Sequence, residues 1–191
     1  MMTTKTDRSP AAIADEAIAL FMRLGTLHYG EKVSQLDHAL QCAHNARLAD
    51  EDEAMIAASL LHDIGHLLHH EGEDAAERGI DTRHEITGAD WLHERFGPAV
   101  SEPVRLHVDA KRYLALRQPT YVASLSPASL ESLALQGGPM DADEASCFEQ
   151  EPYRAEALRL RDYDDLGKKD RDDLPAFDSY RDMLVRLARQ G

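Results

Sequence analysis

The sequence predicts an all-α protein that folds as a single domain. Apolar residues recur at helical spacing through most of the chain, and no stretch keeps the alternation typical of a strand. Helix-start residues and Gly or Pro stops separate the apolar segments. A chain of 191 residues is long enough to bury one sizeable core. We therefore expect residues 1–191 to form one domain, with residues 1–10 as a flexible N-terminus.

The first two helices have clear start signals. Residues 11–24 carry apolar positions at helical spacing and follow a Ser-Pro pair, which is typical of a helix start. Ser34 and Asp37 are three residues apart, and this spacing predicts a capping box. The helix that they start should continue to about Leu48.

The longest apolar segment covers residues 52–69 and predicts a single helix. Gly65 lies inside it, where a glycine is tolerated at a cost of about 1 kcal/mol relative to alanine. Residues 70–83 are charged and contain glycine, so they are expected to form a loop.

Further start and stop signals divide the second half of the chain. A helix from Thr82 or Arg83 to Phe96 should end at a Gly-Pro pair, and another should follow over residues 98–116. Ser126 before a proline predicts the start of a helix that stops at a Gly-Gly-Pro run. The remaining helices are expected at about 141–150, 152–166 and 176–189.

The composition excludes several classes of protein. The net charge of −14 argues against a nucleic-acid partner, which would need a basic surface. No segment approaches the roughly 18 apolar residues of a membrane span, and the polar N-terminus lacks the apolar region of a secretory signal. Cys42 and Cys147 do not make a disulfide framework, and Cys42 is expected to be a small core residue. These features favour a cytoplasmic protein that binds neither membranes nor nucleic acids.

The His62-Asp63 pair is the first indication of a metal site. It interrupts an apolar helical segment, where polar groups are costly to bury unless they are paired or coordinated. Imidazole and carboxylate together suit iron, zinc, manganese or nickel, and the absence of cysteine ligands disfavours a structural zinc site. The metal-competent residues in or beside predicted helices are His38, His62, Asp63, His66, His84, His107 and Asp164.

Helical geometry suggests how these side chains share a site. His62 and His66 are four residues apart and lie on one face, while Asp63 is turned by about 100° from His62. A carboxylate in that position can reach between two ions and bridge them. The other histidines have the features of structural or solvated residues; these are His44, His69, His70 and His93.

The order of His38, His62-Asp63 and Asp164 along the chain resembles the HD-domain superfamily. This resemblance implies an all-helical bundle with a metal site in its core. It implies that His38, His62, Asp63 and Asp164 hold one ion. Asp63 would bridge to a second ion, which His84 and His107 would complete, as in the dinuclear members of the superfamily.

Most HD-domain proteins are phosphohydrolases, so hydrolysis by a metal-bound water is the main rival function. Five further segments instead resemble the iron-dependent 1-hydroxyalkylphosphonate oxygenases, which cleave a carbon–phosphorus bond with O2. This resemblance implies a mixed-valent Fe(II)/Fe(III) pair and an organophosphonate substrate. A non-catalytic binding protein is a third, weaker hypothesis, because all six ligands are present. The segments lie at residues 30–43, 107–114, 126–129, 136–141 and 161–164.

The resemblance also assigns a phosphonate site, whose residues are His66, Lys111, Ser129, Gln136 and Arg161. A phosphonate dianion needs cationic and hydrogen-bonding partners. Lys111 follows His107 by one helical turn, and Arg161 precedes Asp164 by three residues, so both are expected to face the metals. The alternatives are surface ion pairs for the two cations, and helix capping or a local backbone contact for Ser129 and Gln136. Asp63, His66 and Lys111 are the predicted catalytic residues.

The far end of the substrate is expected to be cationic and to face Glu31. In the member of this oxygenase group whose substrate carries an amino group, a tyrosine lies three residues before this glutamate and occupies an iron until the substrate arrives. The present chain has His28 at that position, with Tyr29 beside it. Either residue, or neither, could take the gating role of that tyrosine. Because the residues near Glu31 differ from those of the enzyme with an amino substrate, we expect a different head group. A trimethylammonium group, which has no N–H to donate, fits this change. The predicted substrate is therefore (1-hydroxy-2-(trimethylammonio)ethyl)phosphonate, giving glycine betaine and phosphate, with the 2-amino compound, giving glycine, as the alternative.

Overall fold

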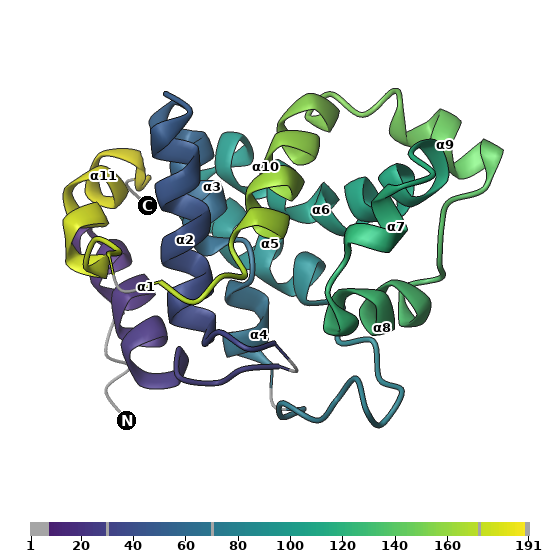
Figure 1. Cartoon of the computed structure of the whole chain (residues 1–191). Helices are drawn as coiled ribbons and strands as arrows, with labels where there is room; N and C mark the ends of the chain where they lie inside the picture. The colour runs from purple at the N-terminus through teal and green to yellow at the C-terminus, as the bar shows by residue number, and fades with distance from the viewer. Residues whose placement is uncertain (1–7, 30, 70, 172, 190–191) are drawn as a thin grey trace, which may run out of the picture.

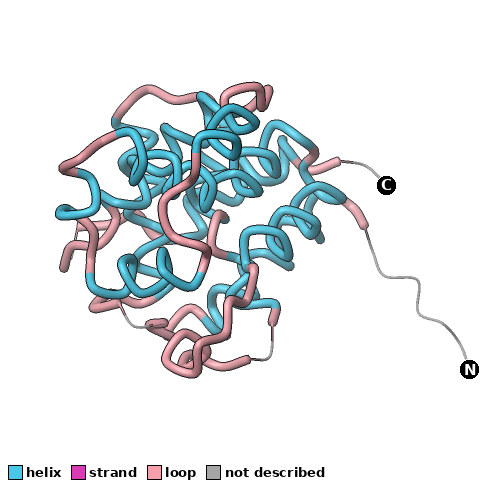
Figure 2. Tube along the Cα trace, turned by 90° about the vertical axis from the view of Figure 1, so that its right-hand side faces the viewer, coloured by secondary structure: helices cyan, strands magenta, loops and turns pink. Residues whose placement is uncertain are grey.

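The computed structural model describes residues 8–29, 31–69, 71–171 and 173–189. Within these ranges every regular element is a helix (Figure 2), which confirms the all-α prediction. The helices, in order, are α1 (Pro10–Leu24), α2 (Gln35–Leu48), α3 (Glu53–Leu61), α4 (Ile64–Leu68), α5 (His84–Phe96), α6 (Pro98–Arg117), α7 (Tyr121–Ser124), α8 (Pro127–Leu135), α9 (Ala142–Phe148), α10 (Arg154–Leu166), the 3₁₀ helix η1 (Phe177–Tyr180) and α11 (Arg181–Leu187).

The predicted caps define where the helices begin. Ser9 caps α1 just before Pro10, and residues 1–7 of the N-terminus that we expected to be flexible lie outside the described residues. Ser34 caps α2 by accepting a hydrogen bond from the backbone N–H of Asp37 at 3.1 Å. The Ser34 hydroxyl also donates to the Asp37 carboxylate at 2.7 Å, which therefore does not complete the reciprocal capping box.

The single helix expected over residues 52–69 is instead two helices, and this part of the prediction is wrong. Regular helix ends at Leu61, and α4 begins at Ile64, so His62 and Asp63 lie at the break. Gly65 is required by close packing. A Cβ atom there would lie 1.9 Å from the backbone oxygen of His84. The glycine thus lets α4 lie directly against the start of α5.

Two further differences concern short elements. The four-residue helix α7 was not predicted, and the C-terminal helix expected from residue 176 begins as the 3₁₀ turn η1 before α11. Charged residues and glycines dominate the segment from 71 to 83, which contains no helix, as expected for its described part.

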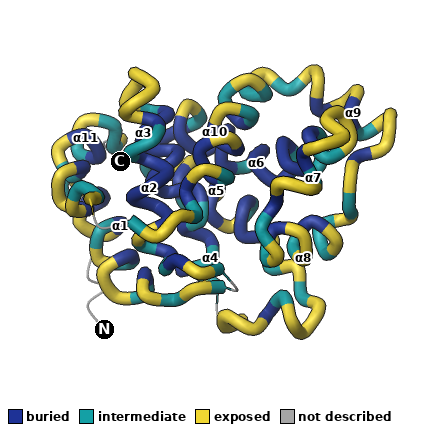
Figure 3. The backbone as a smooth tube through the Cα atoms, in the orientation of Figure 1, coloured by how far each residue is buried: buried dark blue, intermediate teal, exposed yellow. Residues whose placement is uncertain are grey.

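The central helices α2, α3, α6 and α10 pack on one another, with α5 along α6 (Figure 1). The α1 and α11 helices pack together on one side, and α7, α8 and α9 lie toward the other side (Figure 1). Burial is concentrated in the central helices (Figure 3), whose largest fully buried apolar side chains include Leu60, Leu61, Leu106 and Leu160. Among the described residues, no helix combines the length and apolar content needed to cross a membrane.

Candidate metal centre and adjoining pocket

Four histidines from four different elements meet in the core. His38 lies on α2, His62 just after α3, His84 at the first position of α5 and His107 in the middle of α6. All four are buried. The Nε2 atoms of His38 and His62 are 3.2 Å apart, and those of His84 and His107 are also 3.2 Å apart. The break between α3 and α4 and the close packing at Gly65 place these pairs beside each other.

The outer nitrogens of three of these rings bond backbone carbonyls. The Nδ1 of His38 donates to Gly167 at 3.0 Å. The Nδ1 of His62 donates to Ser59 at 2.9 Å, and that of His107 donates to Val104 at 2.7 Å. A neutral imidazole carries one proton, so each of these Nε2 atoms presents a lone pair to the centre. Such outer hydrogen bonds fix the tautomer and orientation of a metal-binding histidine.

In the His38–His62 pair the two Nε2 lone pairs face each other at 3.2 Å, and they repel unless a cation lies between them. Metal–nitrogen bonds of about 2.1 Å at roughly a right angle would separate two nitrogens by about 3.0 Å. The spacing within each histidine pair therefore fits one metal ion per pair. Nitrogen and carboxylate donors without a thiolate ligand are compatible with iron.

Asp63 lies between the two pairs. Its carboxylate oxygens are 3.7, 3.5, 3.4 and 3.8 Å from the Nε2 atoms of His38, His62, His84 and His107. A carboxylate so placed can serve an ion at each pair. Burial would raise the pKa of Asp63, but the surrounding imidazoles hold it well below its usual range.

Asp164 belongs to one pair alone. Its oxygens are 3.3 Å from the Nε2 of His38 and 3.9 Å from that of His62. The six predicted ligands therefore form two groups that share Asp63. Burial lowers the pKa of His107 to about 4 and that of His84 well below its ordinary value, so both rings are neutral near pH 7. Neutral imidazole is the form that binds metal.

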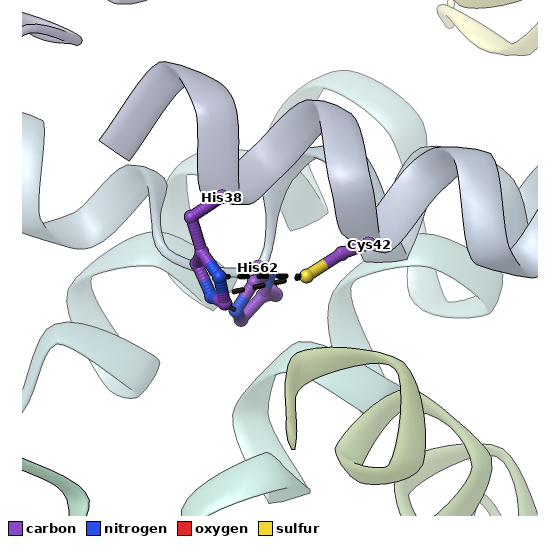
Figure 4. Close-up of side chains that lie close together, drawn as sticks. All are labelled: His38, Cys42 and His62. Carbon is purple, nitrogen blue, oxygen red and sulfur yellow. Dashed lines mark hydrogen bonds between the residues drawn. The ribbon is translucent and has the colours of Figure 1, made fainter. Parts of the chain in front are cut away.

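Cys42 lies beside the His38 ring (Figure 4). Its sulfur is 3.8 Å from both ring nitrogens of His38, so it points directly at neither of them. Burial raises the pKa of the Cys42 thiol, which keeps the thiol protonated at neutral pH. The sulfur is thus close enough to the His38 and His62 nitrogens to be considered as a ligand, but its direction and protonation fit the predicted core role.

A cavity of about 140 Å³ opens onto the metal centre. Five of the six ligands reach its wall, and His62 is the exception. Seven of the eight predicted substrate-binding residues line it as well: Tyr29, Glu31, His66, Lys111, Ser129, Gln136 and Arg161. His28 is exposed and outside this lining; its backbone N–H donates to the Glu73 carboxylate at 2.5 Å. The structure therefore does not bring the His28 side chain to the site.

Tyr29 and His66 form the wall near α4. The Tyr29 hydroxyl donates to the backbone oxygen of His66 at 2.6 Å, and the two rings lie 4.6 Å apart. His66 in turn stacks on His84 with a centroid distance of 3.9 Å. Burial lowers the pKa of His66 to about 4. The face of the His66 ring thus packs against the face of the His84 ring.

The histidines that we expected to be structural differ in their surroundings. We expected His69 to be solvated, but its Nε2 lies 3.4 Å from the Nδ1 of His66. His93 is exposed and contacts the hydroxyl of Ser101 at 3.2 Å. His44 is half-buried on α2, and His70 lies outside the described residues.

Lys111 extends from α6 to the cavity wall. It is almost fully buried, and its ammonium donates to the Ser132 hydroxyl at 2.8 Å. Burial and the nearby Arg161 guanidinium lower the pKa of Lys111 to about 7. An anion bound beside it would favour the protonated form.

Arg161 is buried and is held by carboxylates. It donates to Asp164 at 2.6 Å and, through its Nε and Nη2 atoms, to Asp165. The Asp165 carboxylate is fixed further by the hydroxyl of Tyr121 at 2.8 Å. In this arrangement Arg161 orients the proposed ligand Asp164 while it also lines the cavity.

Gln136 and Gln35 place amide groups at the cavity wall. The Oε1 atom of each is buried and has no hydrogen-bond partner among the described residues. A buried polar atom without a partner is costly, and a ligand with a donor group would satisfy it. Gln35 was not among the predicted site residues.

Lys168 is the main site residue that the sequence analysis missed. Its ammonium donates to Glu31 at 2.8 Å and to the Ser129 hydroxyl at 2.6 Å, and it lines the cavity. A signal was available, because Lys168 follows Asp164 by four residues just as Lys111 follows His107. Burial opposes the charged form, but Asp164 and Glu31 raise the pKa of Lys168 above its ordinary value.

Comparisons with known proteins agree with this fold. Residues 36–145 match the HD domain family. The chain is 38% identical over 169 residues to the (1-hydroxy-2-(trimethylamino)ethyl)phosphonate dioxygenase (glycine-betaine-forming) of Leisingera caerulea, covering 88% of this chain and 86% of that protein. It is 42% identical over 162 residues to the hydroxymethylphosphonate dioxygenase of Gimesia maris, covering 84% of this chain and 81% of that protein.

The chain belongs to the HD domain family and, within it, to the group that includes these phosphonate dioxygenases. The resemblance found in the sequence is therefore confirmed. Its relatives are named as enzymes that use O2, and the two histidine pairs with their shared carboxylate supply the donor set for a two-metal centre.

Proposed function

We propose that this protein is an O2-dependent dioxygenase with two irons that cleaves the carbon–phosphorus bond of a 1-hydroxyalkylphosphonate. The observation that carries the proposal is the cavity at the metal centre, whose wall combines five of the six proposed metal ligands with buried cationic side chains. The names of the two relatives support the reaction class. The products would be a carboxylate and inorganic phosphate.

The metal ligands have distinct positions in this proposal. His38, His62 and Asp164 would hold one iron, His84 and His107 the other, and Asp63 both. The bound irons would supply the oxidising power with O2. The two histidine pairs orient these ions, and the buried walls limit access of water to the substrate.

The phosphonate would lie against Lys111, with Ser129, Gln136 and His66 as further polar contacts on the wall. A dianion is stabilised there by charge-assisted hydrogen bonds. The unpartnered Gln136 oxygen would accept a hydrogen bond from a protonated phosphonate or from the substrate hydroxyl. Arg161 is bound to Asp164, so its positive charge would attract the phosphonate from the far side of that carboxylate.

For the other end of the substrate, the sequence favours the trimethylammonio compound, with the 2-amino compound as the alternative, each with Glu31 as its counterion. Exposed carboxylates at the cavity mouth, from Glu73, Glu77, Asp81 and Glu131, support a cationic group pointing outward. One observation favours hydroxymethylphosphonate as a further candidate substrate. The Glu31 carboxylate is already paired with Lys168, and this compound needs no counterion.

The reaction is tested by phosphate release from the iron-loaded protein with each of the three phosphonates, with and without O2. We expect release with at least one compound, and only when O2 is present. Protein stripped of metal by a chelator is the control and should release none. Equal release without O2 would contradict the oxygenase and favour a phosphohydrolase.

A further inference from the structure

Lys168 connects three parts of the pocket that are far apart in the sequence. It follows α10, and its ammonium donates to Glu31 on the segment before α2 and to Ser129 on α8. The same ammonium is 3.6 Å from an oxygen of Asp164. Each contact is with a residue that the sequence predicts to bind metal or substrate.

The pairing with Lys168 changes what Glu31 can offer a ligand. The Oε1 atom of Glu31 accepts from Lys168 at 2.8 Å and from the Ser126 hydroxyl at 2.7 Å. The side chains of Lys168 and Glu31 are only 16% and 18% exposed. A lysine this close in a poorly solvated place cancels most of the field of the carboxylate. Glu31 is therefore a weak counterion for a cationic substrate as long as Lys168 holds it.

We infer that Lys168 determines substrate specificity by neutralising Glu31, so that the pocket favours 1-hydroxyalkylphosphonates without a cationic group. Hydroxymethylphosphonate is the simplest member of this class. The inference rests on the proposed function, because it assigns the substrate class of the same pocket. Lys168 acts here through Glu31.

The chemistry of the head groups gives an order of preference. A trimethylammonium has no N–H to donate, so its attraction to Glu31 depends on the net charge that Lys168 cancels. A primary ammonium can still donate to Oε2 of Glu31, to which no described residue donates a hydrogen bond. A compound without a cationic group does not depend on Glu31, so it loses no affinity when Lys168 neutralises this carboxylate. We therefore expect affinity to fall from the hydroxymethyl compound to the amino compound and then to the trimethylammonio compound.

The acidic residues at the cavity mouth act in the opposite direction but more weakly. Glu73, Glu77, Asp81 and Glu131 are exposed, so water and salt screen their attraction for a cation. The largely buried Lys168–Glu31 pair is screened less.

The test compares the wild-type protein with Lys168→Met, which keeps the length of the side chain and removes its charge. Binding of each phosphonate to the iron-loaded protein is measured by calorimetry without O2, so that affinity is obtained independently of turnover. In the wild type the hydroxymethyl compound should bind more tightly than the trimethylammonio compound. Lys168→Met should shift this affinity ratio toward the trimethylammonio compound by about tenfold or more, the range of charged hydrogen bonds.

Two further variants make the result specific. Lys169→Met removes the charge of the neighbouring exposed lysine and should leave the affinity ratio unchanged. Glu31→Gln combined with Lys168→Met should abolish the shift, because the effect acts through the Glu31 carboxylate. Circular dichroism and iron content check that each variant is folded and loaded.

The inference is overturned if Lys168→Met weakens the binding of the hydroxymethyl and the trimethylammonio compounds equally, which would make Lys168 a phosphonate ligand. It is also overturned if the wild type binds the trimethylammonio compound more tightly. Binding in the expected order without any oxygen-dependent phosphate release would contradict the proposed reaction and uphold the specificity role. Failure to bind any of the three phosphonates would overturn both.

Discussion

The two halves of the metal centre differ in how completely the protein surrounds them. The half at His38 and His62 has a further carboxylate, Asp164, which Arg161 holds in place. Among the described residues, the half at His84 and His107 has only these two rings and the shared Asp63. With fewer protein donors, the second half leaves more positions open for a substrate, as catalytic metal sites require.

The surroundings of the cavity agree with this difference. Both rings of the second half, His84 and His107, reach the cavity wall, whereas in the first half His38 and Asp164 reach it and His62 does not. Burial also lowers the pKa of both rings in the second half. The two ions would therefore have different tasks. The first would be fixed by the protein, and the second would be available to the phosphonate and the hydroxyl of the proposed substrate.

The largest effect is expected from removing the carboxylate that joins the halves. Asp63→Ala should lose both irons and all turnover, because Asp63 is near all four histidines. Asp164→Ala should lose only the iron of the first half. Metal analysis of the purified variants checks this, and two irons per chain in Asp63→Ala would refute the bridge.

Gly65→Ala should affect one half selectively. The added Cβ would lie 1.9 Å from the backbone oxygen of His84, so α5 must move away and take His84 with it. Overpacking of this kind costs about 3 kcal/mol, which lowers the melting temperature by about 6–12 °C. We expect loss of the second iron with retention of the first.

Gly79→Ala is the matched control for Gly65→Ala. Gly79 has a φ of +74° but no neighbour within 4 Å of an added Cβ, so it should lose only about 1–2 kcal/mol and no iron. A Gly65→Ala protein with both irons and an unchanged melting temperature would contradict the steric account.

The smallest effect concerns Lys111 and pH. Burial lowers the pKa of Lys111 to about 7, so its positive charge is present below this pH and is lost as the pH rises. KM for the phosphonate should therefore rise between pH 6 and pH 9, by about tenfold for the loss of one charged hydrogen bond. Lys111→Met should have the high KM throughout and should keep its iron.

Dividing the wild-type KM by that of Lys111→Met at each pH removes the ionisation of the substrate itself from this comparison. A ratio independent of pH would show that Lys111 does not titrate in this range or does not contact the phosphonate.

Much of the fold was predictable because helix signals are local. Capping residues such as Ser34 and Ser126 mark helix starts by bonding groups only three residues away. The break between α3 and α4 was not predictable, because the pattern of apolar residues continues through it. The close approach of Gly65 to His84 just after the break is a long-range contact that only the folded chain reveals.

The metal centre was more predictable than the substrate pocket. Histidine and aspartate in a helical apolar segment carry a chemical signal of their own, and the six predicted ligands lie together. The pocket depends on long-range pairings such as Lys168 with Glu31, which are separated by most of the chain. Position along the sequence likewise could not show that Tyr29 turns to the cavity while His28 does not.

The last turn of α10 and the two residues that follow it combine several tasks. Asp164 faces the His38 pair, Gly167 accepts the hydrogen bond from His38, and Lys168 reaches Glu31. A Cβ on Gly167 would lie 2.5 Å from the Cys42 sulfur, so this backbone has no room to shift. Inserting one residue here would rotate the following groups by about 100° relative to Asp164. This turn therefore accepts changes of residue type on its exposed side at Asp162 and Leu166, but no change in length.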